Sequence, residues 1–416
     1  MKNPGRFGLA AALLLTFAAF EQSNSVKAAA GPPETMSGPY RVLKPIASGN
    51  LLLFPVVRNT GKAPGETPFI TLDEGIRSGE VEVTEAGRVR GLVRPRGTVG
   101  IPPYHDGRFR SYPEYPHNYS SGAEVNTLVL VNRSKRPLLL LAGEIVTGGK
   151  QDRIVAKDRI VPGGADPIDI SVFCIEPGRW TESSPTFGTS AKTPSDGFMV
   201  QPTVREQAMV TKNQQQVWNS VSGAISQMEM AVAPEPSTAF DGGRAGEMRY
   251  RSLGTSSYAK AMQSSAVSKK VDEAVAPVMK SRDQVLAQLR QEHAVGVVVA
   301  VRGELVWADL FASTDLLSRY WAKLVRSYAA ESLSQGATQA APTMGDAQHF
   351  LDAPSDGTES SVGEVGVYRY RELKSGGTET FVLESLLPGT GYDVHISKMK
   401  LRSAVRPIVK PHPIYR

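Results

Sequence analysis

The side chains best suited to bind or transform a ligand gather in one stretch of the sequence, residues 138–180. This stretch alternates apolar segments with polar, glycine-containing turns. The polar or aromatic side chains that fall at or near the ends of its expected strands are Glu144, Lys150, Gln151, Asp152, Arg153, Glu176, Arg179 and Trp180. Polar groups held on turns between rigid strands are the usual material of binding and catalytic sites. The sequence therefore predicts a site at the ends of these strands.

The chemistry of that predicted site divides between two carboxylates and a set of ligand-binding groups. Glu144 and Glu176 could act as general acid and base if their surroundings separate their pKa values. The predicted ligand-binding residues are Lys150, Gln151, Arg153, Arg179 and Trp180. The cations among them suit a phosphate or carboxylate, and the indole suits a base or sugar. Alternatively, all these groups pair with one another as strand-end salt bridges, which have the same sequence signature.

Several familiar kinds of site do not fit the residues present. Gly149-Lys150 follows an apolar strand, but a phosphate-binding P-loop would need glycine where Glu144 stands and serine or threonine where Gln151 stands. No Gly-x-Ser-x-Gly elbow is present, so a serine hydrolase of that type is unsupported. Cys174 lies in the apolar run ISVFCI, which favours a buried, inert thiol over a nucleophile.

Metal binding and nucleic-acid binding have little support either. The six histidines are scattered, with no pair at a ligand spacing, so we predict no metal site. Glu144, Glu176 and Asp309 could supply oxygen ligands to a hard cation, but nothing in the sequence requires this. The net charge of +6 is mild and no basic cluster dominates, so we expect no nucleic-acid partner. The residues identify no cofactor.

Hydrophobic periodicity predicts an α+β fold: an antiparallel, hairpin-rich sheet, then helices, then a C-terminal hairpin region. Strands are expected at 40–43, 51–57, 81–85, 126–131, 138–146, 153–161, 168–175, 295–301, 304–310, 365–370, 380–386 and 392–396. The four strands within 126–175 are expected to form consecutive hairpins. Helices are expected from residue 71, over 213–225, over 257–291 with a kink at Pro277, and over 314–334.

The organisation of the chain follows from its termini and its composition. Residues 1–30 resemble a cleaved secretory signal, with Lys2 and Arg6 before an apolar core and Ala28-Ala29-Ala30 at its end. An uncleaved anchor is the alternative. We therefore expect a periplasmic or extracellular protein without a stable membrane span after cleavage. The remainder reads as one domain over 39–400, β-rich in 39–190 and mixed α/β in 204–400, with a mobile connection at 231–256 and a basic tail at 401–416. The Tyr- and Pro-rich residues 94–122 are expected to form a long loop.

Two blocks of this stretch are similar to a known bacterial family. GEIVTGGKQDRIVAKDRIVP and ISVFCIEPGRW resemble the core motif of the ARG and rhodanese-phosphatase-superfamily-associated protein domain, and the likeness extends over about residues 39–400. The residues that match the motif are Glu144, Lys150, Gln151, Arg153, Glu176, Gly178, Arg179 and Trp180, with looser matches at Asp309 and His395. The resemblance implies the handling of ADP-ribose or a related nucleotide-derived ligand, and it implies no particular reaction.

Two functional hypotheses follow. In the first, the chain binds or processes a small anionic ligand, with Lys150, Arg153 and Arg179 as its anchors and Glu144 or Glu176 as acid or base. In the second, it is a non-enzymatic envelope or interaction protein whose motif braces the sheet, and the 94–122 loop meets a protein partner. The two differ in whether the charged side chains converge on a ligand or pair off in closed bridges.

Overall fold

The computed structural model describes much of the chain from residue 39 onwards. The described residues are 39–59, 67–88, 126–191, 193, 196–233, 252–279, 282–334, 339–354 and 357–401. All described residues belong to one compact unit. The predicted signal segment 1–30, the 94–122 loop, most of the 231–256 connection and all but the first residue of the 401–416 tail lie outside the described residues.

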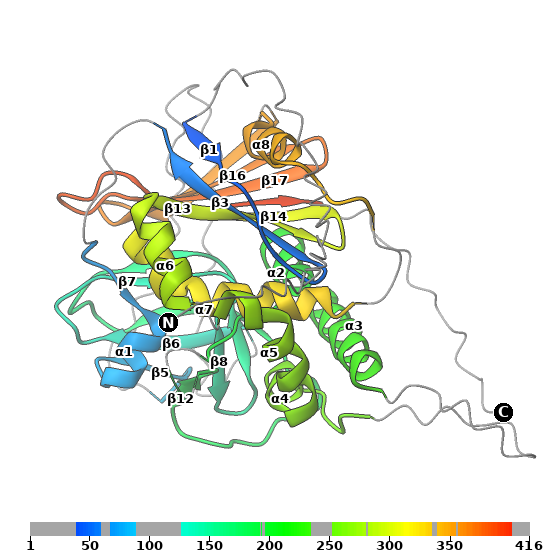
Figure 1. The fold of residues 1–416 in the computed structure, drawn as a ribbon. Coiled ribbons are helices and arrows are strands. Elements are labelled where there is room, and N and C mark those ends of the chain that lie inside the picture. The colour runs from blue at the N-terminus through cyan, green and yellow to red at the C-terminus, as the bar shows by residue number, and fades with distance from the viewer. Residues whose placement is uncertain are drawn as a thin grey trace, which may run out of the picture. The chain divides into compact units, whose positions relative to one another are not determined.

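The larger sheet has nine strands in the order β1-β3-β13-β14-β18-β17-β16-β15, with β2 also paired to β3 (Figure 1). Its strands are β1 (Tyr40–Val42), β2 (Ile46–Ser48), β3 (Leu51–Arg58), β13 (Ala294–Val301), β14 (Glu304–Phe311), β15 (Thr358–Glu364), β16 (Tyr368–Ser375), β17 (Thr378–Ser385) and β18 (Asp393–Lys400). All of these pairings are antiparallel. The last strand of the described residues, β18, therefore lies inside the sheet rather than at its edge.

Two smaller sheets are built from the middle of the β-rich region. Six strands follow the order β12-β8-β9-β11-β6-β5, and three follow the order β10-β7-β4, in which β4 and β7 are parallel. Their strands are β4 (Ile70–Thr71), β5 (Val81–Glu85), β6 (Thr127–Asn132), β7 (Leu138–Leu140), β8 (Ile145–Gly148), β9 (Arg153–Val155), β10 (Arg159–Val161), β11 (Ile168–Cys174) and β12 (Phe187–Thr189). These sheets carry the stretch in which the site is predicted.

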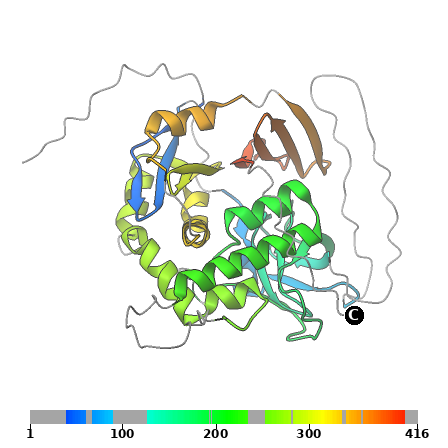
Figure 2. The same ribbon diagram turned by 90° about the vertical axis from the view of Figure 1, so that its right-hand side faces the viewer.

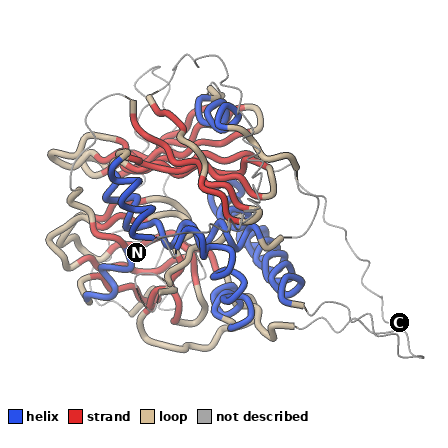
Figure 3. Tube along the Cα trace, in the orientation of Figure 1, coloured by secondary structure: helices blue, strands red, loops and turns tan. Residues whose placement is uncertain are grey.

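The helices cover both faces of the large sheet. They are α1 (Leu72–Ser78), α2 (Pro202–Glu206), the π-helical turn η1 (Gln207–Thr211), α3 (Gln214–Val232), α4 (Tyr258–Gln263), α5 (Ser265–Met279), α6 (Arg282–Gln291), α7 (Thr314–Ser332) and α8 (Met344–Asp352). Figure 3 shows the strands as two groups with α7 between them, and Figure 2 shows the green helices between the red strands and the cyan strands. None of the helices in the described part of the chain is long and apolar enough to cross a membrane.

Burial explains this layering. The main hydrophobic core joins the inner face of the large sheet to α7, α3, α5 and one face of the smaller sheets. A second core fills the space between the smaller sheets, and a third lies under α8 on the outer face of the large sheet. The capping box of Thr71 and Glu74 starts α1, and Gly79, at φ 73°, ends it. Sequence periodicity thus places the apolar face of most elements correctly, and the predicted α+β class is confirmed.

Pairing differs from the prediction between residues 126 and 175. The expected strands 138–146 and 153–161 are each two short strands, because the chain turns at Gly143 (φ 87°) and again around Asp158. Two of the expected hairpins form: 138–146 pairs with 153–161 through β7–β10 and β8–β9, and 153–161 pairs with 168–175 through β9–β11. The first expected hairpin is wrong, because β6 pairs with β5 and β11 and not with β7. The side chain of Asn132 donates to the carbonyls of Val161 and Pro162, which connects the end of β6 to the end of β10. Two elements, α8 and β15, carry too few apolar residues for periodicity to reveal them.

Candidate functional site

The candidate site lies at the end of the hairpin formed by β8 and β9. Gly148 and Gly149 have φ values of 127° and 49° and make the turn. A Cβ at Gly149 would come within 2.2 Å of the Phe187 ring and 2.6 Å of the Glu85 carboxylate, so only glycine fits there. The backbone N–H of Lys150 donates to Glu85 Oε1 at 2.7 Å, which fastens the turn to the end of β5. The predicted residues 150–153 are therefore held on a rigid support.

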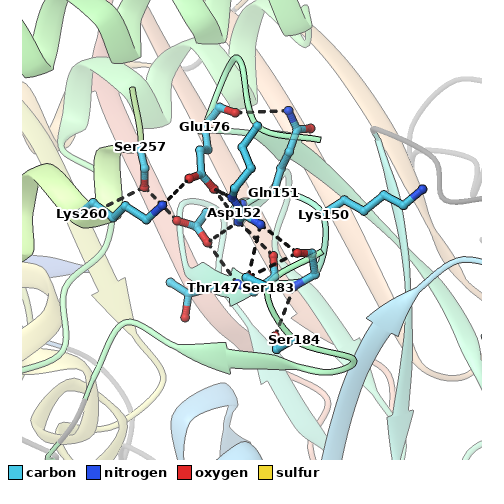
Figure 4. Close-up of polar contacts among 12 residues, drawn as sticks. Thr147, Lys150, Gln151, Asp152, Glu176, Ser183, Ser184, Ser257 and Lys260 are labelled. Carbon is cyan, nitrogen blue, oxygen red and sulfur yellow. Dashed lines mark hydrogen bonds and ion pairs between the residues drawn. The ribbon is translucent and has the colours of Figure 1, made fainter. Parts of the chain in front are cut away.

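Five side chains form what we call the hairpin-end cluster: Asp152, Glu176, Arg179, Ser257 and Lys260 (Figure 4). Glu176 accepts from Arg179 Nε at 2.7 Å and from Lys260 Nζ at 2.8 Å. Asp152 accepts from the Ser257 hydroxyl at 2.8 Å and lies 3.4 Å from Arg179. The cluster therefore ties the hairpin, the segment after β11 and the start of α4 together.

Arg179 has little capacity left for a ligand. Besides its contacts with the two carboxylates, its guanidinium donates to the carbonyl oxygens of Gly148, Gly149 and Thr181 at 3.3, 2.9 and 2.8 Å. A guanidinium has five N–H donors, and these acceptors occupy them. In this arrangement Arg179 braces the hairpin turn against the loop that follows β11.

The two carboxylates of the cluster have pKa values shifted in opposite directions. Burial and the neighbouring Glu176 raise the pKa of Asp152. Burial acts on Glu176 in the same sense, but the hydrogen bonds from Arg179 and Lys260 prevail and lower its pKa. Such divergence is typical of acid–base pairs and also of structural networks. Here the carboxylates of Asp152 and Glu176 both accept several hydrogen bonds from the chain, which favours a structural role over a catalytic one.

Arg153 differs from every other predicted site residue. Its side chain is fully buried in β9, and within the described residues none of its three guanidinium nitrogens has a hydrogen-bond acceptor. Burial lowers its pKa, while Cys174 and Glu85 act in the opposite direction. Glu85 Oε2 and Gln151 Oε1 are also buried without a hydrogen-bond partner in that part of the structure. Nearly all buried polar groups in native proteins are paired, so we expect these three groups to have a partner beyond the described residues.

Lys150, Gln151 and Trp180 occupy different surroundings. Trp180 is 46% exposed, and the ammonium of Lys150 lies 5.1 Å from the centre of its ring. Figure 4 shows Lys150 pointing away from the hairpin-end cluster, whereas Lys260 reaches into it. Gln151 is buried and donates its amide N–H to the carbonyl of Glu176 at 3.1 Å. The predicted residues thus form a buried layer and a partly exposed aromatic–cation pair beside one turn.

Glu144 belongs to a separate group. It is fully buried, pairs with Lys323 Nζ at 2.5 Å and accepts from the backbone N–H of Leu141 at 2.8 Å. Lys323 also pairs with Asp73 at 2.9 Å. Burial raises the pKa of the Glu144 carboxyl, and the ion pair opposes that shift. Glu144 and Glu176 have no partner in common among the interactions of the described residues, so the structure does not bring the two predicted acid–base groups together.

Asp309 and His395, the looser matches to the family motif, form the centre of a third buried group. The two ring nitrogens of His395 face Asp158 Oδ2 at 2.6 Å and Asp309 Oδ1 at 3.1 Å. Arg205 donates to Asp309 at 2.9 Å, and Tyr328 also donates to that carboxylate. Asp158 and Asp309 overcome the effect of burial and raise the pKa of His395 to about 9. This group joins β14 and β18 of the large sheet to the turn before β10.

The sequence analysis named the acidic and basic residues of the 138–180 stretch but missed the residues elsewhere in the chain that pair with them. Lys323 is seven residues after Leu316 in α7, so helical spacing places this cation on the buried face of the helix. That spacing could have predicted a buried acidic partner for Lys323. Ser257 had the weaker signal of a helix N-cap. For Lys260, Asp158 and Arg205 the sequence offered none. No group of three or more potential ligand side chains within the described ranges could hold a metal ion.

Comparison with known proteins yields one match. The model of a family described as "ARG and Rhodanese-Phosphatase-superfamily-associated Protein domain" matches residues 39–399. No curated protein and no solved structure matches the chain. The family's name refers to the proteins with which it is associated and states no reaction. The resemblance inferred from the two motif blocks is confirmed, and it covers all three buried groups and the hairpin turn.

Proposed function

The chain belongs to the family of ARG and rhodanese-phosphatase-superfamily-associated protein domains, and from that premise we propose that it binds a small anionic ligand, ADP-ribose or a related nucleotide, at the end of the β8–β9 hairpin. The observation that carries the proposal is Arg153, a fully buried guanidinium without a hydrogen-bond acceptor in the described structure. An unpaired buried charge costs several kcal/mol, and a protein retains such a group where a ligand compensates for it.

The surrounding groups suit a ligand that offers both acceptors and donors. A phosphate or carboxylate would accept two parallel hydrogen bonds from the guanidinium of Arg153. Hydroxyl groups, such as those of a ribose, would donate to the unpaired oxygens of Glu85 and Gln151. Trp180, which is exposed, and Lys150, which lies over its ring, would receive a flat ring and a second negative group. The closely packed Gly148-Gly149 turn and the hairpin-end cluster would hold these groups in place.

Binding without catalysis fits the carboxylates better than a hydrolytic reaction does. Glu176 accepts hydrogen bonds from Arg179, Lys260 and the backbone, and Glu144 is closed off by Lys323. A general base must reach the proton that it removes, and neither carboxylate has a lone pair directed at open space in these contacts. In our proposal both glutamates position the ligand-binding turn, and the ligand is not consumed.

Titration calorimetry on the full chain tests the proposal. The ligands are ADP-ribose, AMP, ribose 5-phosphate and inorganic phosphate, and the variant is Arg153→Gln. Arg133→Gln is the matched control, because Arg133 is an exposed arginine whose guanidinium pairs with Glu82, away from the proposed site. We expect at least one phosphate-bearing ligand to bind the wild type and the control, and Arg153→Gln to lose more than tenfold in affinity. Equal affinity in all three proteins would refute the site.

A second candidate is supported by the closed ion pairs: a non-enzymatic envelope or interaction protein in which the motif only braces the sheets. The observation in its favour is that the charges of Glu144, Glu176 and Arg179 are all satisfied within the chain. It expects Glu144→Gln to lower stability, and it expects no ligand to raise the melting temperature of the wild type. A ligand-dependent rise that disappears in Arg153→Gln would exclude it in favour of the first proposal.

We also propose export of the chain through residues 1–30. The support is the order of a basic start, an apolar core and a small-residue end in that segment. Immunoblotting of cell fractions would test it, with the intact chain compared with a variant that begins at residue 31. Recovery of both forms in the same fraction would contradict export.

A further inference from the structure

The two edges of the large sheet differ in how the described residues cover them. At the first edge, the side chain of Gln348 in α8 accepts from the backbone N–H of Val42 at 2.8 Å and donates to the carbonyl of Tyr40 at 3.1 Å, which satisfies two backbone groups of β1. At the second edge, β15 pairs with β16 over its whole length, and no strand of the described ranges pairs with its other side. An uncovered edge strand is a template for pairing with another segment.

The side chains of β15 indicate what kind of segment would fit beside it. The strand, TESSVGE, contains Glu359 and Glu364 and no cation. Glu364 lies 3.5 Å from Arg159, whereas Glu359 belongs to the exposed start of the strand, residues 358–360. Val362 points to the opposite face from Glu359 and packs, half-buried, against the main core. A complementary strand would therefore carry cations on one face and apolar side chains on the other.

The sequence after β18 has this pattern. Residues 402–416, RSAVRPIVKPHPIYR, lie outside the described residues, and their residue types alternate. The four cations all fall at even positions, together with two isoleucines: Arg402, Arg406, Ile408, Lys410, Ile414 and Arg416. The three prolines all fall at odd positions, together with two valines and a tyrosine: Val405, Pro407, Val409, Pro411, Pro413 and Tyr415. Successive side chains of a strand point to opposite faces, so an extended form of this segment would have a basic face and a face of proline, valine and tyrosine.

The spacing of the prolines suits an edge strand. The backbone N–H groups of a strand also alternate, so those of the even residues would face β15 and those of the odd residues would face away from it. Proline has no N–H and is tolerated in an edge strand where that N–H would face solvent. Because every proline of the segment is odd, the N–H groups of its even residues all remain available for pairing.

Strand β18 brings the segment to the correct end of β15. Leu401 donates its backbone N–H at 2.8 Å to the carbonyl of Gly377, in the turn between β16 and β17. That turn adjoins the start of β15, because Thr358 lies opposite Lys374. Strands lie about 4.8 Å apart, so roughly 15–20 Å separate Leu401 from the free side of β15, a distance that about six extended residues span. Residues 408–414 would then lie beside β15 and run parallel to it.

We propose that residues 402–416 fold back past the β16–β17 turn and pair with the free side of β15 as a parallel edge strand. The even residues donate to β15, and their cations lie on the face of Glu359. The odd residues place Val409 and its neighbouring prolines on the face of Val362. The segment covers the second edge of the sheet as Gln348 covers the first, and it keeps β15 from pairing with strands of other molecules.

Hydrogen exchange followed by mass spectrometry tests the proposal through the amides of β15. The full chain is compared with a shortened chain that ends at residue 401 and keeps the whole range matched by the family model, residues 39–399. Amides held in a strand exchange through opening of that strand, so we expect the outward amides of β15 to exchange at least about tenfold faster in the shortened chain.

Two substitutions of adjacent apolar residues test the pairing itself. Ile408→Pro removes an N–H that faces β15 in the proposed strand, whereas Val409→Pro removes one that faces away, and neither changes the charge. We expect Ile408→Pro to accelerate the exchange of β15 as the shortened chain does. Val409→Pro, the matched control, should leave that exchange as it is in the wild type.

Three outcomes would overturn the proposal. Equal exchange of β15 in the full and shortened chains would show that residues 402–416 do not cover this edge. Equal exchange in the two proline variants, whether fast or slow, would exclude pairing through the even residues. Protection of β15 that increases with protein concentration would exclude the fold-back, because the segment would then come from a second copy.

Discussion

Replacing Arg153 by methionine should make the ligand-free protein more stable. A buried arginine normally stabilises a fold through its hydrogen bonds, but the Arg153 guanidinium has no acceptor among the described residues and its side chain is fully buried. Methionine fills a similar volume, adapts to irregular surroundings and has no charge to desolvate. Exchanges of buried ionic groups for well-packed apolar ones are often stabilising by about 1–4 kcal/mol. We expect Arg153→Met to fall within that range.

The corresponding change in melting temperature is small but measurable. The entropy of unfolding is about 2.1 cal/mol/K per residue, so for a folded unit of this length 1 kcal/mol corresponds to roughly 1 °C. We therefore expect a rise of about 1–4 °C in calorimetric scans of extensively dialysed protein. Urea titration should show the same sign. A ligand present at a hundred times its Kd should stabilise the wild type by about 2.7 kcal/mol and leave Arg153→Met unchanged.

Arg159→Met provides the matched control for this experiment. Arg159 is equally buried in the neighbouring strand β10, but it donates to the Asp169 carbonyl at 2.7 Å and lies 3.5 Å from Glu364. Its replacement removes partners from buried groups and should destabilise the protein by about 3–5 kcal/mol. If Arg153→Met destabilises the protein as Arg159→Met does, Arg153 is a structural residue and the reasoning that assigns it to a ligand is refuted.

Three further predictions concern the other groups. Trp180→Ala should weaken binding of AMP by about 1–3 kcal/mol through lost stacking and leave inorganic phosphate binding unchanged, as calorimetry would show; equal losses for both would contradict a stacking role. Lys323→Met should cost about 3–5 kcal/mol in urea denaturation because it leaves Glu144 buried without its cation, and a loss below about 1 kcal/mol would count against the closed pair. The stability held by His395 should be complete below about pH 6.5 and disappear as the pH rises through about 9, because its pKa is raised to about 9 in the folded state. His395→Gln should flatten stability over that interval, and an unchanged pH profile would show that the imidazole does not titrate there.

Local signals located the elements and the turn of the site, but not their long-range partners. Alternation and helical spacing depend only on which face of an element is apolar, so they identified β13, β14 and α7 well. Strand β6 pairs with β5 and β11 and not with the strand that follows it in the sequence, which local patterns cannot reveal. The sequence also could not show that Glu144 and Glu176 belong to different buried groups.

The lack of long-range information in the sequence also explains why it could not separate structural residues from ligand-binding ones among the candidates. Which cation reaches which carboxylate is decided by the meeting of segments far apart in the chain, as in the pairing of Lys323 with Glu144, 179 positions away. Residue types suggested three equivalent anion anchors, whereas the contacts separate them: Arg179 is fully engaged, Lys150 lies at the surface over Trp180, and Arg153 is buried without an acceptor. Only the three-dimensional arrangement distinguishes a cation with a structural role from one that is available to a ligand.

The place of β18 inside the large sheet has a consequence for biosynthesis. Until Asp393–Lys400 leaves the ribosome, β14 and β17 both present an unpaired edge, and Asp158 and Asp309 lack the imidazole that lies between them. Unpaired strand edges are templates for association with other chains. The nascent chain must therefore wait for β18 before its largest sheet can close, and we expect it to depend on chaperones during that interval more than a protein whose strands pair in order of synthesis.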